Sequence, residues 1–242
     1  MLRRLPLLAA AGSLVVLLPA GPAAAARDPL AGKPPATACR TPALTQGGVT
    51  EAEPYARAVL KCLERAWSAH FKRAGASFAR PKVLYLAEPR SEICGGAWPE
   101  GAWAFYCIKP RTLVLPLFGP WIEGREDLFP LKVMAHEYGH HLQRLAGTWS
   151  PARPVAKPKA LEFRRRYELQ ADCLAGAFLG SVWASTGGTA ADWAALVEES
   201  SRGDWLDDQP THGSGKTRGA WLKRGFAGGS CDTWSAPAAK IT

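Results

Sequence analysis

The spacing of apolar residues predicts one long helix and two short strands in the first half of the chain. Over residues 50–74, apolar residues recur every three or four positions with charged residues between them, a pattern typical of an amphipathic helix. Residues 82–86 and 112–115 are short apolar runs that each follow a proline closely, and both predict strands. The glycine- and aromatic-rich segment between them, residues 94–107, predicts a loop or hairpin.

The second half is predicted to be mainly helical. Residues 131–146 have helical spacing, with Asp127 and Pro130 suited to the start of the helix and Gly147 to its end. A loop over roughly residues 148–158 precedes a longer helical pattern at residues 160–185, whose small residues favour close packing against a neighbour. Residues 190–200 and 216–226 predict two more helices. The sequence therefore predicts an α+β fold that is mostly helical, with a small sheet.

The first 26 residues have the features of a secretory signal peptide. Arg3 and Arg4 precede an apolar run at residues 5–18, and residues 24–26 are alanines suited to cleavage. The run is about 14 residues long, shorter than the roughly 20 needed to span a bilayer. We expect an extended lead-in at residues 27–49 and one domain at residues 50–242, exported to the cell envelope or the medium.

All six cysteines lie beyond this leader, and an even number in an exported chain predicts up to three disulfides. The sequence alone leaves the pairing open. Sequential pairing would join Cys39 to Cys62, Cys94 to Cys107, and Cys173 to Cys231. A thiolate zinc site would need a close pair such as C-x-x-C, and the chain has none. We therefore expect a domain stapled by disulfides.

The net charge of +9 falls to +7 when Arg3 and Arg4 leave with the signal peptide, because 28 basic residues then face 21 acidic ones. A basic exported protein is attracted to anionic surfaces, so we expect it to associate with an anionic cell envelope. Basic residues cluster at 157–166 and 216–224, a pattern typical of solvated helix faces. No nucleic-acid-binding motif accompanies the charge, and we expect no nucleic acid partner.

The predicted helix at residues 131–146 contains the pattern H-E-x-x-H. His136 and His140 lie about 40° apart on the helix surface, close enough to bind one ion. Two imidazoles suit zinc, and the carboxylate of Glu137 is placed to take a proton from a metal-bound water. His141 points about 100° away from His140, so we expect it to face solvent or to support the ligands from behind.

A zinc site needs a third ligand, and the next predicted helix offers two carboxylates on one face, Glu168 and Asp172. Glu168 completes a His₂Glu set with an open position for water, as in catalytic rather than structural zinc sites. Asp172 is suited to accept a hydrogen bond from the free ring nitrogen of a ligand histidine. We expect one Zn²⁺ per chain.

Four motifs resemble a bacterial family known as the putative neutral zinc metallopeptidases. They are the runs MAHEYGHHLQ at residues 134–143, YELQADCLAG at 167–176, THGS at 211–214 and CDTW at 231–234. The surroundings of Cys94 and Tyr106-Cys107 are similar too. More distantly, the pattern resembles gluzincin peptidases. The resemblance implies a zincin-like α+β fold, zinc ligands at His136, His140 and Glu168, Glu137 as catalytic base, and Asp172 as partner of a ligand histidine.

We therefore expect a secreted zinc metallopeptidase that acts on peptide or protein substrates, with Glu137 as general base. His212, in a glycine-containing loop, is the candidate donor to the oxyanion, although a structural role is equally compatible with the sequence. The strand at residues 112–115 is a candidate edge strand for an extended substrate. Two alternatives stay open: an exported envelope-binding protein with a structural zinc site, and an amidase that acts on cell-wall peptides with the same metal chemistry. The sequence predicts no oligomeric state.

Overall fold

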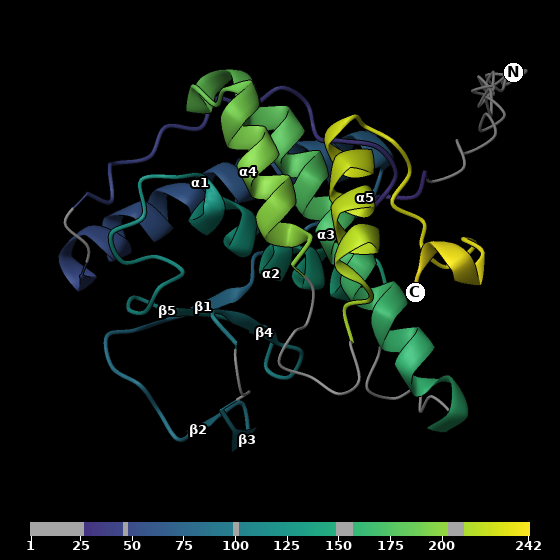
Figure 1. Ribbon diagram of the computed structural model, residues 1–242, viewed down its shortest axis with the longest axis horizontal. Helices are drawn as coiled ribbons and strands as arrows, with labels where there is room; N and C mark the ends of the chain where they lie inside the picture. The colour runs from purple at the N-terminus through teal and green to yellow at the C-terminus, as the bar shows by residue number, and fades with distance from the viewer. Residues whose placement is uncertain (1–26, 46–47, 99–101, 149–156, 203–210) are drawn as a thin grey trace, which may run out of the picture.

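The computed structural model is an α+β fold, as predicted, with helices gathered on one side of a small sheet (Figure 1). It describes residues 27–45, 48–98, 102–148, 157–202 and 211–242. The helices are α1 (Val49–Ala74), α2 (Phe129–Leu145), α3 (Lys157–Thr186), α4 (Ala190–Ser200), α5 (Gly215–Phe226) and the 3₁₀ turn η1 (Ala238–Lys240). The strands are β1 (Lys82–Leu86), β2 (Glu92–Ile93), β3 (Gly96–Ala97), β4 (Phe105–Cys107) and β5 (Thr112–Pro116). The predicted signal peptide and most of the loop at 148–158 lie outside the described residues.

The residues predicted to begin and end α2 lie at the two ends of the helix. The side chain of Asp127 accepts a hydrogen bond from the N–H of Phe129 at 3.1 Å, and Pro130 lies in the first turn, where its missing N–H costs nothing. At the other end, Gly147 has a φ of +73°, and the N–H of Thr148 returns to the carbonyl of Gln143. The helix begins at Phe129, two residues before its predicted start.

The three-stranded sheet has the order β1-β5-β4, with β1 parallel and β4 antiparallel to β5. The prediction that residues 112–115 form an edge strand is therefore wrong, because β5 is the central strand. Its three consecutive apolar residues, Leu113, Val114 and Leu115, are all fully buried, which is typical of a strand covered on both faces. In the three-stranded sheet, the edge strand antiparallel to its neighbour is β4.

The two faces of β5 contribute to different apolar clusters. Leu113 and Leu115 belong to the main core, which the helices share with the sheet, whereas Val114 points to the opposite face with Leu86 and Cys107. In α2, the side chains of Leu131, Met134, Tyr138 and Leu142 are fully buried, and that of Leu145 is partly buried. The main core therefore lies where the helices pack on the sheet and on one another, and α1, α2 and α3 contribute most of its residues.

Helices α3 and α5 approach so closely that glycines are required at their contact. A Cβ at Gly176 of α3 would collide with the carbonyl oxygen of Leu222, and a Cβ at Gly225 of α5 would collide with that of Cys173. The predicted close packing of the small face of α3 is thus achieved backbone to backbone. As a result, Arg218 of α5 reaches Asp172 of α3, which in turn contacts His136 of α2.

The three disulfides follow the sequential pairing, Cys39 to Cys62, Cys94 to Cys107 and Cys173 to Cys231, with Cα atoms 5.4, 5.8 and 5.5 Å apart. Such bonds persist in oxidising compartments and suggest a protein that resides outside the cytoplasm. Among the described residues, none of the helices is both long and apolar enough to cross a membrane.

Candidate metal centre

His136 and His140 lie one turn apart on α2 and point toward α3. Both side chains are buried, and their rings meet edge to face with centroids 4.9 Å apart. The i, i+4 spacing puts the two imidazoles on one strip of the helix surface. Their Nε2 atoms converge on a single oxygen, Oε2 of Glu168, at 3.2 Å for His136 and 3.1 Å for His140.

Glu168 comes from α3, the helix packed against α2. Its carboxylate and the two imidazoles each offer one ligand atom, and these three atoms lie within 4.8 Å of one another. Two imidazole nitrogens and one carboxylate oxygen are a donor set that zinc prefers in catalytic sites. The three residues predicted as ligands are therefore brought together as a possible metal-binding group.

The ring nitrogens that face away from Glu168 also have partners. Nδ1 of His136 lies 2.9 Å from Oδ1 of Asp172, and Nδ1 of His140 lies 2.8 Å from Oε1 of Gln143. Both partners are oxygen acceptors, so each Nδ1 carries a proton and Nε2 is the atom left to bind a metal. The sequence predicted the contact of Asp172 but missed that of Gln143.

The charges of the site shift the pKa values of the acidic and basic groups in opposite directions. Burial alone would raise the pKa of Glu168, but the charges of His140 and His212 hold it well below its usual value. Burial alone would lower the pKa of His140, but the carboxylate of Glu168 raises it to about 9. The carboxyl group of Glu168 therefore stays ionised beside the imidazoles.

Glu137 follows the first histidine on α2 and is half-buried. Burial raises the pKa of its carboxyl group, while the charges of His136 and His140 oppose that shift. A carboxylate beside a metal-binding group with a raised pKa has the properties of a general base.

Asp172 is fully buried and contacts two cationic side chains as well as the imidazole of His136. In addition to His136, its carboxylate lies 3.2 Å from Nζ of Lys132 and 2.9 Å from Nε of Arg218. Burial alone would raise the pKa of Asp172, but Arg218 and Lys132 hold it well below its usual value. Sequence reasoning missed Lys132, although its place one turn before His136 on a buried face was a usable signal.

His212 precedes α5, in the loop where the sequence placed it. Its Nε2 lies 3.2 Å from Oε2 of Glu168, and its ring centroid is 5.9 Å from that of His136. Nδ1 lies 3.1 Å from the hydroxyl of Thr211. The side chain is only partly buried, so a group that approaches the metal-binding residues from solvent can reach it.

His141 does not face solvent, and this part of the prediction is wrong. It is buried, with Nδ1 3.0 Å from the hydroxyl of Tyr106 and Nε2 2.7 Å from the carbonyl oxygen of Ala79. Burial lowers its pKa to about 4. Its position about 100° from His140 directs it toward β4 rather than outward, because the sheet covers that side of α2.

The sequence predicted that the two basic clusters lie on solvated helix faces, but several of their arginines make structural contacts. Arg166 donates to the carbonyl oxygens of Thr233 and Ala236, and Arg224 donates to that of Ser230. With Arg218 on Asp172, three arginines of these clusters tie helices to the C-terminal segment or to the metal-binding group.

Comparison with known proteins agrees with this geometry. A family model described as "Putative neutral zinc metallopeptidase" matches residues 29–234. The uncharacterized protein YpfJ of Escherichia coli K12 is 28% identical over 208 residues, covering 76% of this chain and 72% of that protein. The uncharacterized protein Rv2575 of Mycobacterium tuberculosis is 29% identical over 201 residues, covering 66% and 64%. No solved structure matches. The chain belongs to the family of putative neutral zinc metallopeptidases.

Proposed function

We propose that the protein is an exported zinc metallopeptidase that holds one Zn²⁺ through His136, His140 and Glu168. The observation that carries the proposal is the convergence of both Nε2 atoms on one oxygen of Glu168, with each Nδ1 bonded to an acceptor behind it. Three protein ligands leave a position open for water, whereas structural zinc sites are normally closed by four.

The residues around the ligands have the chemistry that peptide hydrolysis requires. When bound, zinc lowers the pKa of a coordinated water and polarises the substrate carbonyl. Glu137 takes the proton of the attacking water and delivers it to the leaving nitrogen. His212 donates a hydrogen bond to the carbonyl oxygen as that oxygen gains negative charge. Asp172 keeps the ring of His136 oriented.

The substrate is a peptide or protein that lies in extended form along the sheet. Because β5 is central, the strand available for pairing beside α2 is β4, which lies at the edge and runs antiparallel to β5. A groove between β4 and the β2–β3 hairpin, lined by Phe105, Tyr106 and Lys109 among others, adjoins this strand.

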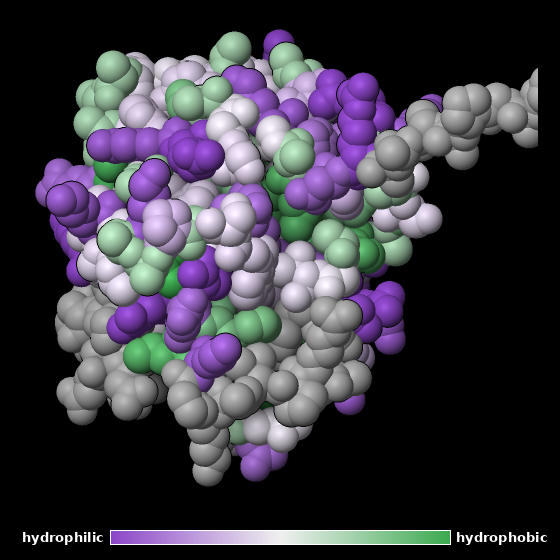
Figure 2. Space-filling view, turned by 90° about the vertical axis from the view of Figure 1, so that its right-hand side faces the viewer, coloured by the Kyte–Doolittle hydropathy of each residue, from purple (hydrophilic) through white to green (hydrophobic). Residues whose placement is uncertain are grey.

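Export is proposed from the leader at residues 1–26, and the three disulfides support it. Outside the cell, the net positive charge favours association with anionic polymers of the envelope. The face shown in Figure 2 mixes hydrophilic, intermediate and apolar residues.

The proposal is tested by measuring the zinc content of the protein and then its hydrolysis of a protein substrate. Elemental analysis of residues 27–242, purified without chelator, should find about one zinc per chain. Glu137→Gln should keep that zinc and lose hydrolysis of an unfolded protein substrate, because an amide cannot act as base. Glu168→Ala should lose zinc, whereas Glu162→Ala, an exposed change on the same helix, should not. Full hydrolysis by Glu137→Gln, or a wild-type protein that retains no zinc, would refute the proposal.

A further inference from the structure

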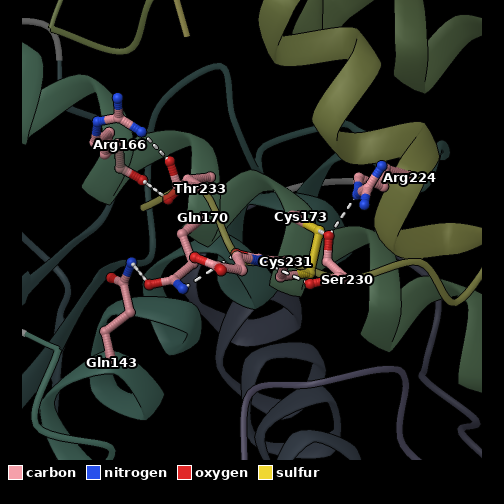
Figure 3. The surroundings of a disulfide bond; sticks show 9 residues. Gln143, Arg166, Gln170, Cys173, Arg224, Ser230, Cys231 and Thr233 are labelled. Atoms are coloured by element: carbon pink, nitrogen blue, oxygen red, sulfur yellow. Dashed lines mark hydrogen bonds between the residues drawn. A yellow bond between two sulfur atoms is a disulfide. The ribbon is translucent and has the colours of Figure 1, made fainter. Parts of the chain in front are cut away.

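The C-terminal segment Cys231–Trp234 is held firmly against α3. The disulfide from Cys173 fixes one end, and the hydroxyl of Thr233 donates to the carbonyl oxygen of Arg166 at 2.7 Å (Figure 3). In return, the guanidinium of Arg166 donates to the carbonyl oxygen of Thr233. The backbone carbonyl of Cys231 is therefore a fixed acceptor, although it lies far along the chain from the proposed zinc ligands.

From this carbonyl, two buried amide side chains lead to His140. Nε2 of Gln170 donates to the carbonyl oxygen of Cys231 at 3.1 Å, so its Oε1 must face the other way. That oxygen accepts from Nε2 of Gln143 at 3.0 Å and from the indole N–H of Trp234 at 3.4 Å. Figure 3 shows the two glutamines end to end between α2 and the disulfide.

The orientation of the second amide follows from the first. Nε2 of Gln143 also donates to the carbonyl oxygen of Tyr167 at 2.7 Å, so both of its N–H groups are used on acceptors. Its Oε1 is left to face Nδ1 of His140 at 2.8 Å. Since an amide oxygen only accepts, Nδ1 must be the donor. Two backbone carbonyls thus determine which nitrogen of His140 is available to a metal.

We propose that Gln143 and Gln170 are positioning residues that act through His140, and that the disulfide between Cys173 and Cys231 is their anchor. The inference rests on the proposed zinc site but not on the reaction. Both amides are buried, so water cannot replace a lost hydrogen-bond partner. If the hydrogen bonds between Cys231, Gln170 and Gln143 are broken, Gln143 is free to turn its N–H groups toward His140. Nε2 would then compete with Nδ1 for the proton, and zinc would bind less tightly.

Zinc affinity, measured by competition with a chelator of known affinity, tests the glutamines. Gln143→Met keeps the shape of the side chain but removes its acceptor, and should weaken zinc binding about 10- to 100-fold. Gln170→Met should weaken it in the same direction but less, because it acts through one more side chain. The matched control is Ser181→Ala, buried on α3 like Gln170; within the described part of the chain its hydroxyl bonds to the carbonyl oxygen of Phe178 of the same helix. It should leave zinc affinity unchanged.

A spectroscopic readout separates positioning from general damage. In the Co²⁺-substituted protein, the Nδ1 proton of a ligand histidine gives a shifted, exchangeable NMR signal. The His140 signal, assigned with a His140→Gln variant, should be protected from exchange in the wild type and lost or fast-exchanging in Gln143→Met. A Gln143→Met protein that retains wild-type zinc affinity and a protected His140 signal would overturn the proposal.

The anchor is tested by removing disulfides one at a time. Both Cys173→Ala with Cys231→Ala, and Cys39→Ala with Cys62→Ala, remove a cross-link and lower stability. Only the first pair should also lower zinc affinity in protein shown by circular dichroism to be folded. Equal affinities would overturn the anchoring role, and this arm keeps the proposal testable if a glutamine variant does not fold. A protein that shows these effects but hydrolyses no peptide would refute the proposed function alone.

Discussion

Replacing Asp172 by asparagine should destabilise the protein far more than the loss of an ordinary ion pair. The carboxylate is fully buried and receives four close polar contacts, one from Nδ1 of His136, one from Nζ of Lys132 and two from the guanidinium of Arg218. Asparagine keeps the shape but not the charge. The ammonium of Lys132 is buried, and among the described residues Asp172 is the carboxylate that pairs with it, so the variant leaves this cation without a paired counter-charge.

The expected loss follows from the cost of a buried charge without a partner. Breaking a buried pair by removing one member costs about 3–5 kcal/mol of unfolding free energy, whereas exposed pairs contribute about 0–1 kcal/mol. Urea unfolding of the chelator-treated protein measures this term apart from zinc binding. Glu162→Gln is the control, because it breaks the exposed pair of Glu162 with Arg166 on the same helix, and it should cost less than about 1 kcal/mol.

A second variant makes the reasoning refutable. If the cost arises from the uncompensated cation, then Lys132→Met added to Asp172→Asn should recover part of the lost stability, so that the double variant is less destabilised than the sum of the two single ones. A loss under about 1 kcal/mol for Asp172→Asn, matching the exposed control, would show that the cluster is relaxed by solvent. Strict additivity in the double variant would show that the two groups do not interact.

Three further outcomes are expected. Gly225→Ala should lower the unfolding free energy by at least about 1–3 kcal/mol in urea titrations, because its Cβ would collide with the carbonyl oxygen of Cys173. Tyr106→Phe should cost about 1 kcal/mol by the same assay through the lost bond to His141, and should leave zinc affinity unchanged. Chelation should lower the melting temperature in calorimetry, and zinc in 100-fold excess over its Kd should restore about 2.7 kcal/mol.

Local spacing was enough to predict much of the fold and the three possible ligands. The i, i+4 positions of His136 and His140 depend only on the helix, and Glu168 was identified because a second helix carried carboxylates on one face. The edge position of residues 112–115 was predicted wrongly because strand order depends on pairings that a short run of apolar residues does not encode. The fully apolar run Leu113–Leu115 was nevertheless a signal for a central strand.

Two of the residues that sequence reasoning missed make their contacts across long separations in the chain. Arg218 meets Asp172 across 46 positions, and Gln170 meets the carbonyl of Cys231 across 61. Such contacts arise where α5 and the C-terminal segment pack on α3, and no period in the sequence reports them. A lysine or glutamine on a helix otherwise reads as a solvated side chain.

Two of the three histidines of α2, His136 and His140, are supported by acceptors that contact, directly or through Gln170, different parts of the C-terminal region. The acceptor behind His136 is Asp172, which Arg218 of α5 holds, whereas the acceptor behind His140 is Gln143, which is held through Gln170 by the carbonyl of Cys231. The H-E-x-x-H pattern by itself therefore supplies two of the three proposed ligands, His136 and His140, but not the acceptors behind them. Arg218 and the carbonyl of Cys231 both follow α4, and both lie within residues 29–234, which the family model matches.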